Sequence, residues 1–248
     1  MRKYQIVPLN VGDFEALPKQ TCTYRMFREV TYKAPCIMWY IKGTKDNIIV
    51  DLGPPDPVQC LENHGLVITR SEKQEPLNAL KSHGISPDDV KTVLLTHLHY
   101  DHASGFHLFK NARFLIQRKE VEYAIAPLPC HHSLYYENNM RKPPFVDYLD
   151  KIDVINGDCE IEDGVNAVFI PSHSPGFQGV SVKTEKGNYF IAGDAVGLFE
   201  CWETVPHIPS GIFNNLEQYY LSMEKIDKIT DFVLPGHDPR VFDSSVYP

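Results

Sequence analysis

The sequence has no long apolar run, no paired cysteines and no surplus of positive charge, and each absence excludes a class of protein. None of its apolar stretches approaches the ~20 residues that a helix needs to cross a bilayer. The amino terminus starts with basic residues, but Pro8 and Asn10 interrupt it. It therefore lacks the roughly 7–15 apolar residues in the core of a secretory signal. We expect a cytoplasmic protein that does not act in a membrane.

The cysteines and the net charge count against two further classes of protein, those held together by disulfides and those that bind nucleic acid. Six cysteines are scattered along the 248 residues without a C-x-x-C pair. Without an export signal they are expected to be free thiols rather than a disulfide framework. The formal net charge is −8. Because a nucleic-acid backbone would meet net repulsion, we expect no nucleic acid as a partner.

Strand-like segments alternate with a few helical ones, and neither a repeat nor a Gly/Ser-rich linker divides the chain. We therefore expect a single α/β domain that spans residues 1–248. Short apolar, β-branched runs predict strands at 5–9, 37–41, 47–50, 90–95, 113–117, 154–156, 167–170, 179–182, 189–192 and 232–234. Apolar spacing and end signals predict helices at 76–82, 106–109, 118–125 and 214–226. Residues 54–75 are expected to form a loop.

The segment at about 126–150 has a composition of its own. It is interrupted by four prolines and is rich in Tyr, His and Asn. Since it is aromatic and not Gly/Ser-rich, we expect an inserted lid that faces a substrate rather than a linker. Simple packing of the aromatic residues is the alternative. The pair His131-His132 lies in this segment and is a candidate for substrate contact.

Residues that can bind metal follow four of the expected strands. The run Thr96 to His102, THLHYDH, comes directly after the strand at 90–95. The other three are His173, Asp194 and His237, each one to four residues after a strand-like run. Open α/β sheets place their chemistry just past the carboxyl ends of strands. Imidazole and carboxylate groups together suit Zn²⁺ and similar divalent ions.

The run His97-Leu98-His99-Tyr100-Asp101-His102 resembles the HxHxDH motif of the metallo-β-lactamase superfamily. The later SHSPG, GD and GH segments resemble its remaining motifs in order, and Asp51-Leu52-Gly53 resembles a structural motif of the same superfamily. The resemblance implies a four-layer αβ/βα sandwich. It also implies one metal held by His97, His99 and His173, a second held by Asp101, His102 and His237, and Asp194 as a bridge. The alternative for this ligand set is a chance clustering. For the isolated histidines outside the motifs we expect ordinary surface or core roles: His64, His83, His107 and His207.

Within the superfamily the chain most resembles the N-acyl-homoserine-lactone lactonases. Its length is similar, and so are the 71 residues from His102 to His173 and the 21 from His173 to Asp194. This resemblance implies a quorum-quenching hydrolase that opens a lactone ring with a hydroxide shared by two divalent ions. Asp101 and Asp194 are the candidate catalytic carboxylates, as proton shuttles. Zn²⁺ is the default ion, Co²⁺, Mn²⁺ and Fe²⁺ fit the same ligands, and a homodimer is common in such proteins.

One position departs from the lactonase pattern. Gly197 stands where these lactonases usually carry a tyrosine whose phenol contacts the lactone carbonyl. Losing a donor of that kind can cost ~10²–10³ in rate. Tyr123, Tyr135 and Tyr136 are candidates to replace it. The departure leaves open a hydrolase of another lactone, or of a thioester as in glyoxalase II. A non-catalytic, metal-binding regulator on the same fold is the alternative outside enzymes.

Overall fold

Two β-sheets pack face to face in the computed structural model, which describes residues 4–138 and 140–248. In the larger sheet the strand order is β4-β1-β2-β3-β5-β6-β7. Its strands are β1 (Gln5–Pro18), β2 (Thr31–Lys42), β3 (Asn47–Val50), β4 (Ile68–Thr69), β5 (Val90–Leu94), β6 (Arg113–Gln117) and β7 (Ile152–Ile155). In the smaller sheet the order is β12-β11-β10-β9-β8. Its strands are β8 (Cys159–Glu162), β9 (Val165–Phe169), β10 (Gln178–Lys183), β11 (Asn188–Gly193) and β12 (Phe232–Pro235).

Strand β2 shows why the sheets need cover on both faces. Its side chains at 37, 39 and 41 belong to one apolar cluster, which also contains residues of β9, β10, β11 and β12. The side chains at 36, 38 and 40 belong to a second cluster, which extends under the helices. Because successive side chains of a strand point to opposite faces, the sheet is buried on both sides. The first cluster is the core between the two sheets, and the second fills the space under the outer layer.

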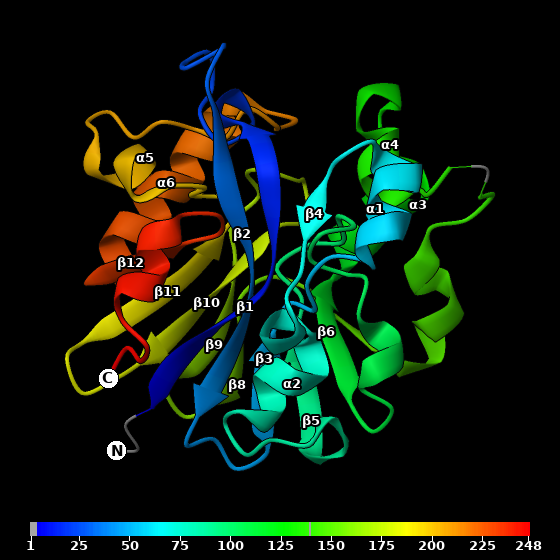
Figure 1. Ribbon diagram of the computed structural model, residues 1–248. Helices are drawn as coiled ribbons and strands as arrows, with labels where there is room; N and C mark the ends of the chain where they lie inside the picture. Colours follow the sequence, from blue (N-terminus) through cyan, green and yellow to red (C-terminus); the bar gives the residue numbers. More distant parts are fainter. Residues whose placement is uncertain (1–3, 139) are drawn as a thin grey trace.

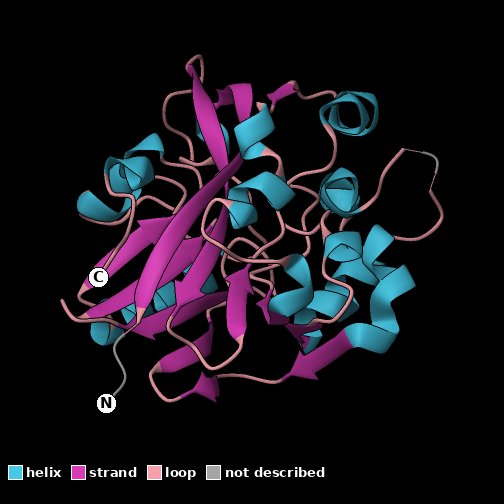
Figure 2. Cartoon of the chain, turned by 60° about the horizontal axis from the view of Figure 1, so that its bottom comes forward, coloured by secondary structure: helices cyan, strands magenta, loops and turns pink. Residues whose placement is uncertain are grey.

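Helices form the two outer layers. Figure 1 shows α5 and α6 beside the smaller sheet, with α1, α3 and α4 on the opposite side of the molecule. The turned view of Figure 2 likewise shows strands in the middle and helices on both sides. The helices are α1 (Pro57–His64), α2 (Pro76–Lys81), α3 (Arg118–Ile125), α4 (His132–Tyr135), α5 (Phe199–Glu203) and α6 (Leu216–Ile229). The expected four-layer α/β sandwich is therefore confirmed. Among the described residues, no helix combines the length and the apolar character that crossing a bilayer would require.

The structure differs from the expected elements in several places; strand β8 and helix α5, for example, had no expected counterpart. The segment 54–75 is not all loop, because α1 begins after Asp56, whose side chain accepts a hydrogen bond from the Val58 amide at 2.9 Å. This N-cap with Pro57 at the first helical position is a helix-start signal. Strand β1 continues to Pro18 through two register shifts against β2. The helix expected at 106–109 is a single 3₁₀ turn at Phe106–Leu108.

The strand order brings the ends of several strands to one edge. Strands β3 and β5 run parallel as neighbours, and so do β11 and β12. Residues that follow parallel neighbours emerge at the same edge of a sheet. Asp51 thus lies beside Thr96, and Asp194 lies near His237. The face-to-face packing of the sheets then brings these two edges together.

Candidate metal centre

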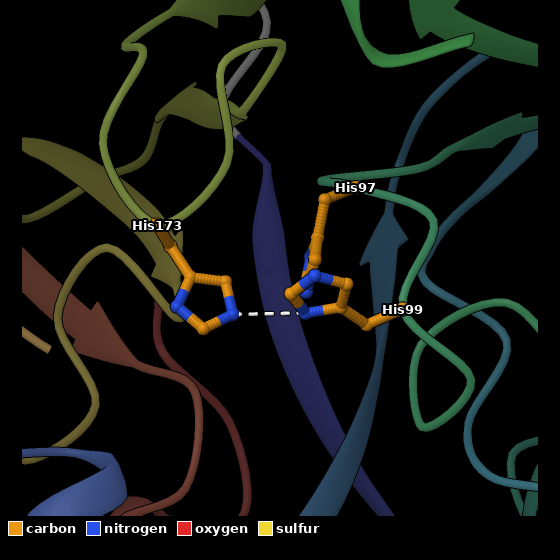
Figure 3. Close-up of side chains that lie close together, drawn as sticks. All are labelled: His97, His99 and His173. Atoms are coloured by element: carbon orange, nitrogen blue, oxygen red, sulfur yellow. Dashed lines mark hydrogen bonds between the residues drawn. The ribbon is translucent and has the colours of Figure 1, made fainter. Parts of the chain in front are cut away.

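Three histidines from two separate loops meet at one point. His97 and His99 follow β5, and His173 follows β9. Their nearest ring nitrogens all lie within 4.8 Å of one another, and His99 Nδ1 is 2.9 Å from His173 Nε2. Figure 3 shows the three rings turned toward a common point. All three residues are buried, at 3% exposure or less. This arrangement offers three nitrogen ligands to one ion.

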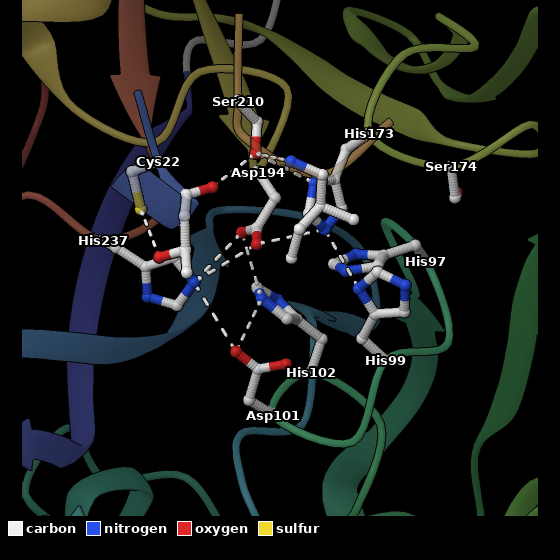
Figure 4. Close-up of polar contacts among 12 residues, drawn as sticks. Cys22, His97, His99, Asp101, His102, His173, Ser174, Asp194, Ser210 and His237 are labelled. Carbon is white, nitrogen blue, oxygen red and sulfur yellow. Dashed lines mark hydrogen bonds and ion pairs between the residues drawn. The ribbon is translucent and has the colours of Figure 1, made fainter. Parts of the chain in front are cut away.

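A second group lies directly beside the first. It consists of Asp101, His102, Asp194 and His237, whose ligand atoms again lie within 4.8 Å of one another. Asp194 Oδ1 is 3.1 Å from His102 Nε2 and 3.2 Å from His237 Nε2. Its other oxygen, Oδ2, is 3.5 Å from His173 Nε2 in the first group. Figure 4 shows the Asp194 carboxylate between the two groups, so one side chain contacts both. The structure brings together all seven residues that the sequence singled out.

Asp51 holds the loop that carries the first motif. Its Oδ1 accepts the Thr96 amide at 2.7 Å, and its Oδ2 accepts the Thr96 hydroxyl at 2.8 Å and faces His102 Nδ1 at 2.9 Å. The Thr96 hydroxyl oxygen lies 2.9 Å from His97 Nδ1. Since that hydroxyl donates to Asp51, its oxygen accepts from the imidazole N–H. One buried carboxylate therefore orients a histidine of each group, and leaves Nε2 of both rings free for an ion.

His173 and His237 are anchored in the same way. His173 Nδ1 lies 3.2 Å from the Ser210 hydroxyl, and His237 Nδ1 lies 2.9 Å from the Pro35 carbonyl oxygen. A carbonyl oxygen can only accept, so Nδ1 of His237 carries the proton. Nε2 is then the atom available to a metal. These outer contacts fix both the tautomer and the direction of each ring.

The protonation states divide the site into two parts. Burial lowers the pKa of His97 and His99 well below the usual range, and it lowers that of His173 to about 4. For His102 and His237, burial acts in the same direction, but the nearby Asp194 and Asp101 outweigh it and raise the pKa. Without an ion, the surroundings thus favour the neutral form of the three-histidine group and the protonated form of His102 and His237.

The donor set fits a pair of divalent ions. The Nε2 atom of His97 is buried, and no group in the described part of the chain forms a hydrogen bond with it. A buried polar atom without a partner is costly unless something else satisfies it. Nitrogen and carboxylate ligands of this kind suit Zn²⁺ and the neighbouring divalent metals. The cluster therefore fits a dinuclear metal site.

A small cavity of about 110 Å³ opens onto both groups. Its lining includes His99, Asp101, His173, Asp194 and His237, together with apolar side chains of β1 and of the segment at 126–150. Leu134 supplies the contact from that segment, and its carbonyl oxygen accepts the Tyr100 amide at 2.9 Å. Residue 139 of the segment lies outside the described residues.

The packing of Gly197 explains why a larger residue is absent there. A Cβ at this position would lie 2.7 Å from Cβ of Cys22 and 3.0 Å from its Sγ. Real Cβ atoms do not tolerate such distances. Cys22 lines the cavity, and its Sγ lies 3.3 Å from the Tyr32 hydroxyl. The space beside Asp194 is thus filled by a thiol from the loop after β1.

The three tyrosines suggested as replacements have other partners. The Tyr135 hydroxyl donates to Glu120 at 3.0 Å, and the Tyr136 hydroxyl donates to the Ile125 carbonyl at 2.7 Å. The Tyr123 hydroxyl lies 2.8 Å from His131 Nδ1. Among the described residues that line the cavity, none of these three appears, whereas Tyr100 and Cys22 do.

Sequence reasoning missed Glu120, which lies in the first turn of α3 and is fully buried. Its carboxylate accepts the Leu98 amide at 3.0 Å and the Ser174 hydroxyl at 2.5 Å, in addition to Tyr135. Glu120 therefore connects the loop of His97 and His99 with the loop of His173. A single glutamate at the start of a helix is an ordinary sequence feature, so no local signal marks this role.

Comparisons with known proteins agree with this geometry. The family model described as "Metallo-beta-lactamase superfamily" matches residues 33–245. The N-acyl homoserine lactonase AiiA of Bacillus thuringiensis subsp. kurstaki is 32% identical over 214 residues, which cover 80% of each chain. The N-acyl homoserine lactonase AttM of Azorhizobium caulinodans is 29% identical over 169 residues, which cover 66% of this chain and 64% of AttM.

The fold agrees as well. A solved structure of an N-acyl homoserine lactone hydrolase, with N-hexanoyl-L-homoserine at its catalytic metal centre, superimposes with a TM-score of 0.79 at 23% identity. The superposition covers 98% of this chain and 96% of the other. Sequence, fold and the paired ligand groups lead to the same result: the chain belongs to the metallo-β-lactamase superfamily.

Proposed function

We propose that this protein is a dinuclear metal hydrolase that opens the lactone ring of N-acyl homoserine lactones. The observation that carries the hydrolase proposal is the position of Asp194, which contacts a three-histidine group and a second ligand group in one cavity. The lactone is supported by the 32% identity with N-acyl homoserine lactonases over 80% of the chain.

In this proposal His97, His99 and His173 hold one ion, Asp101, His102 and His237 hold the other, and Asp194 serves both. We propose Zn²⁺, because imidazole and carboxylate ligands in a buried site are typical of it. When bound, such a pair lowers the pKa of a water molecule and polarises a carbonyl oxygen.

Asp101 is the proposed proton shuttle. Of the seven proposed ligands, Asp101 alone is partly exposed to solvent, and it lines the cavity. Its contacts with His102 and His237 both use Oδ2, at 3.7 Å and 3.6 Å. Oδ1 is thus left to take a proton from the attacking water and to hand it to the ring oxygen as the ring C–O bond breaks. The products are an alcohol and a carboxylic acid, which releases its remaining proton to solvent and becomes a carboxylate. Asp194, which holds the ligand groups together, is the second proposed catalytic carboxylate.

The segment at 126–150 is proposed as one wall of the substrate site. Leu134 borders the cavity, and the Tyr135 ring packs edge-on against His99 at 4.6 Å between ring centroids. These contacts exclude water from one side of the ligand groups.

A second candidate substrate is a thioester or another lactone. The observation that favours it is the thiol of Cys22 beside Gly197, in place of a phenol near Asp194. Burial raises the pKa of this thiol to about 12, so it remains protonated at neutral pH. A thiol is a weaker donor than a phenol.

The test is a side-by-side hydrolysis screen of acyl-homoserine lactones, thioesters and β-lactams with the metal-loaded protein. We expect ring opening of the lactones, loss of activity after chelation and recovery when Zn²⁺ is added back. Asp101→Asn should lower kcat, whereas Asp89→Asn, on the exposed surface, should not. Intact lactones beside cleaved thioesters would replace the proposed substrate with the second candidate. No hydrolysis of any substrate by fully loaded protein would contradict the enzyme itself.

A further inference from the structure

A second hollow adjoins the cavity of the metal centre. It has a volume of about 490 Å³ and lies over the loop between β1 and β2. Thr21 and Ile212 line both the hollow and the metal-site cavity. The remaining lining includes Tyr24, Arg25 and Arg28. The hollow, called here the arginine groove, is thus next to the cavity that the candidate metal ligands line, with Thr21 and Ile212 between them.

Hydrogen bonds connect the floor of the arginine groove to a metal ligand. The Thr21 carbonyl oxygen accepts the Ser210 hydroxyl and the Gly211 amide, both at 2.9 Å. The Ser210 hydroxyl also lies 3.2 Å from His173 Nδ1. The Tyr24 amide donates to the Pro209 carbonyl oxygen at 2.8 Å. The loop that carries the arginines is thus held in a defined position relative to the reaction centre.

The two arginines have no anionic partner in the structure. Both are exposed, and within residues 4–138 and 140–248 neither guanidinium forms a hydrogen bond or an ion pair. Arg25 lies 6.0 Å from the centre of the Tyr24 ring. Arg113, by contrast, is paired with Asp153. No carboxylate lines the arginine groove, although the chain as a whole carries a net charge of −8.

The backbone at Arg25 adds a separate observation. Its φ is 60°, in the left-handed region that glycine and asparagine adopt more easily. Local backbone preference therefore does not explain an arginine at this position. A residue that keeps its side chain at a backbone cost is a candidate for a functional role.

From these features we infer that the arginine groove binds an anionic group at the far end of the substrate's acyl part. The preferred substrates would then be lactones whose acyl chain ends in a carboxylate. The guanidinium plane suits a carboxylate because it can donate two parallel hydrogen bonds. This inference rests on the proposed lactonase function and specifies its substrate class.

The test uses pairs of lactones that differ only at the acyl terminus. N-succinyl-, N-adipoyl- and N-suberoyl-homoserine lactones each end in a carboxylate, and the matching carboxamides are neutral and nearly isosteric. We expect the metal-loaded protein to prefer one or more carboxylates by about two- to fivefold in kcat/KM, as exposed ion pairs allow. The preference should lie in KM, since the groove does not touch the reacting ring. It should shrink at high salt.

The variant Arg25→Asn/Arg28→Gln removes both charges and leaves a residue that tolerates the left-handed backbone at 25. It should lose the carboxylate preference and keep its activity on the carboxamides. The matched control is Lys73→Gln/Lys81→Gln, which removes two exposed charges away from both hollows and should keep the preference. Equal kcat/KM for carboxylates and carboxamides in the unaltered protein, or a preference that survives in the double arginine variant, would overturn the inference. Failure to open any of these lactones would instead contradict the proposed function.

Discussion

Replacing Asp51 by asparagine should weaken one of the two metal positions and spare the other. The substitution conserves shape but exchanges one acceptor oxygen for an NH₂ donor. The Thr96 amide lies 2.7 Å from Oδ1 and can only donate, so the remaining oxygen must face it. The new NH₂ group then faces His102 Nδ1, at the position where Oδ2 now lies 2.9 Å away.

The consequence for His102 is a change of tautomer. Two donors cannot face each other, so Nδ1 must give up its proton and Nε2 must carry it instead. Nε2 is the atom that points to Asp194 at 3.1 Å and that would bind the ion. Loss of an outer hydrogen-bond partner typically costs about 10–100-fold in metal affinity. We expect this loss at the position formed by Asp101, His102 and His237, and a smaller change at the three-histidine position.

The assay is metal content and affinity, measured by competition with chelators of graded strength. Asp51→Asn should retain one ion under conditions in which the unaltered protein retains two. Asp89→Asn is the control, because that carboxylate is exposed and belongs to neither ligand group. Circular dichroism and thermal unfolding of the loaded proteins show whether the variant has kept its fold.

Two results would refute the reasoning. Binding of both ions by Asp51→Asn with unaltered affinity would mean that the tautomer of His102 does not depend on Asp51. Equal weakening at both positions, in a protein that keeps its fold, would mean that Asp51 acts on the whole loop and not through one imidazole.

Three further predictions follow from contacts at the site. Gly197→Ala should lower the free energy of unfolding of the loaded protein by about 1–3 kcal/mol in denaturant, because its Cβ clashes with Cys22. Adding Cys22→Gly to that variant should restore part of the lost stability. If the destabilisations of the two substitutions simply add, the two residues are not in contact. Glu120→Gln removes one acceptor from a buried hydrogen-bond network and should lower the free energy of unfolding by about 1–3 kcal/mol. An unchanged midpoint of thermal unfolding would contradict this. Because neighbouring carboxylates raise the pKa of His102 and His237, metal uptake by chelated protein should release protons and strengthen as pH rises. Calorimetry of metal binding in two buffers of different ionisation enthalpy measures how many protons are released. A heat of binding that is the same in both buffers would contradict the prediction.

Local sequence patterns were enough to predict many of the strands, one helix and the candidate metal ligands. Every expected strand overlaps a strand of the structure, since apolar, β-branched runs bounded by Gly, Pro and Asp report burial directly. The helix at 118–125 has the expected bounds. The clustering of the candidate metal ligands was predictable because each of them follows a strand, and strand ends carry the chemistry of α/β sheets. Helix α1 was not expected, although its N-cap residue Asp56 is a helix-start signal in the sequence.

What only the tertiary structure decided are contacts between segments far apart in the chain. The orienting contact from Asp51 to His102 spans 51 residues, and that between Tyr32 and His237 spans 205. Glu120 joins two ligand loops because the two sheets pack face to face, a relation that no local pattern encodes. Two further contacts depend on the same packing: the close approach of Cys22 to Gly197, and the hydrogen bond from the Ser210 hydroxyl to the Thr21 carbonyl oxygen. Sequence determines which groups are available for chemistry, whereas the close packing of the folded core determines which of them touch.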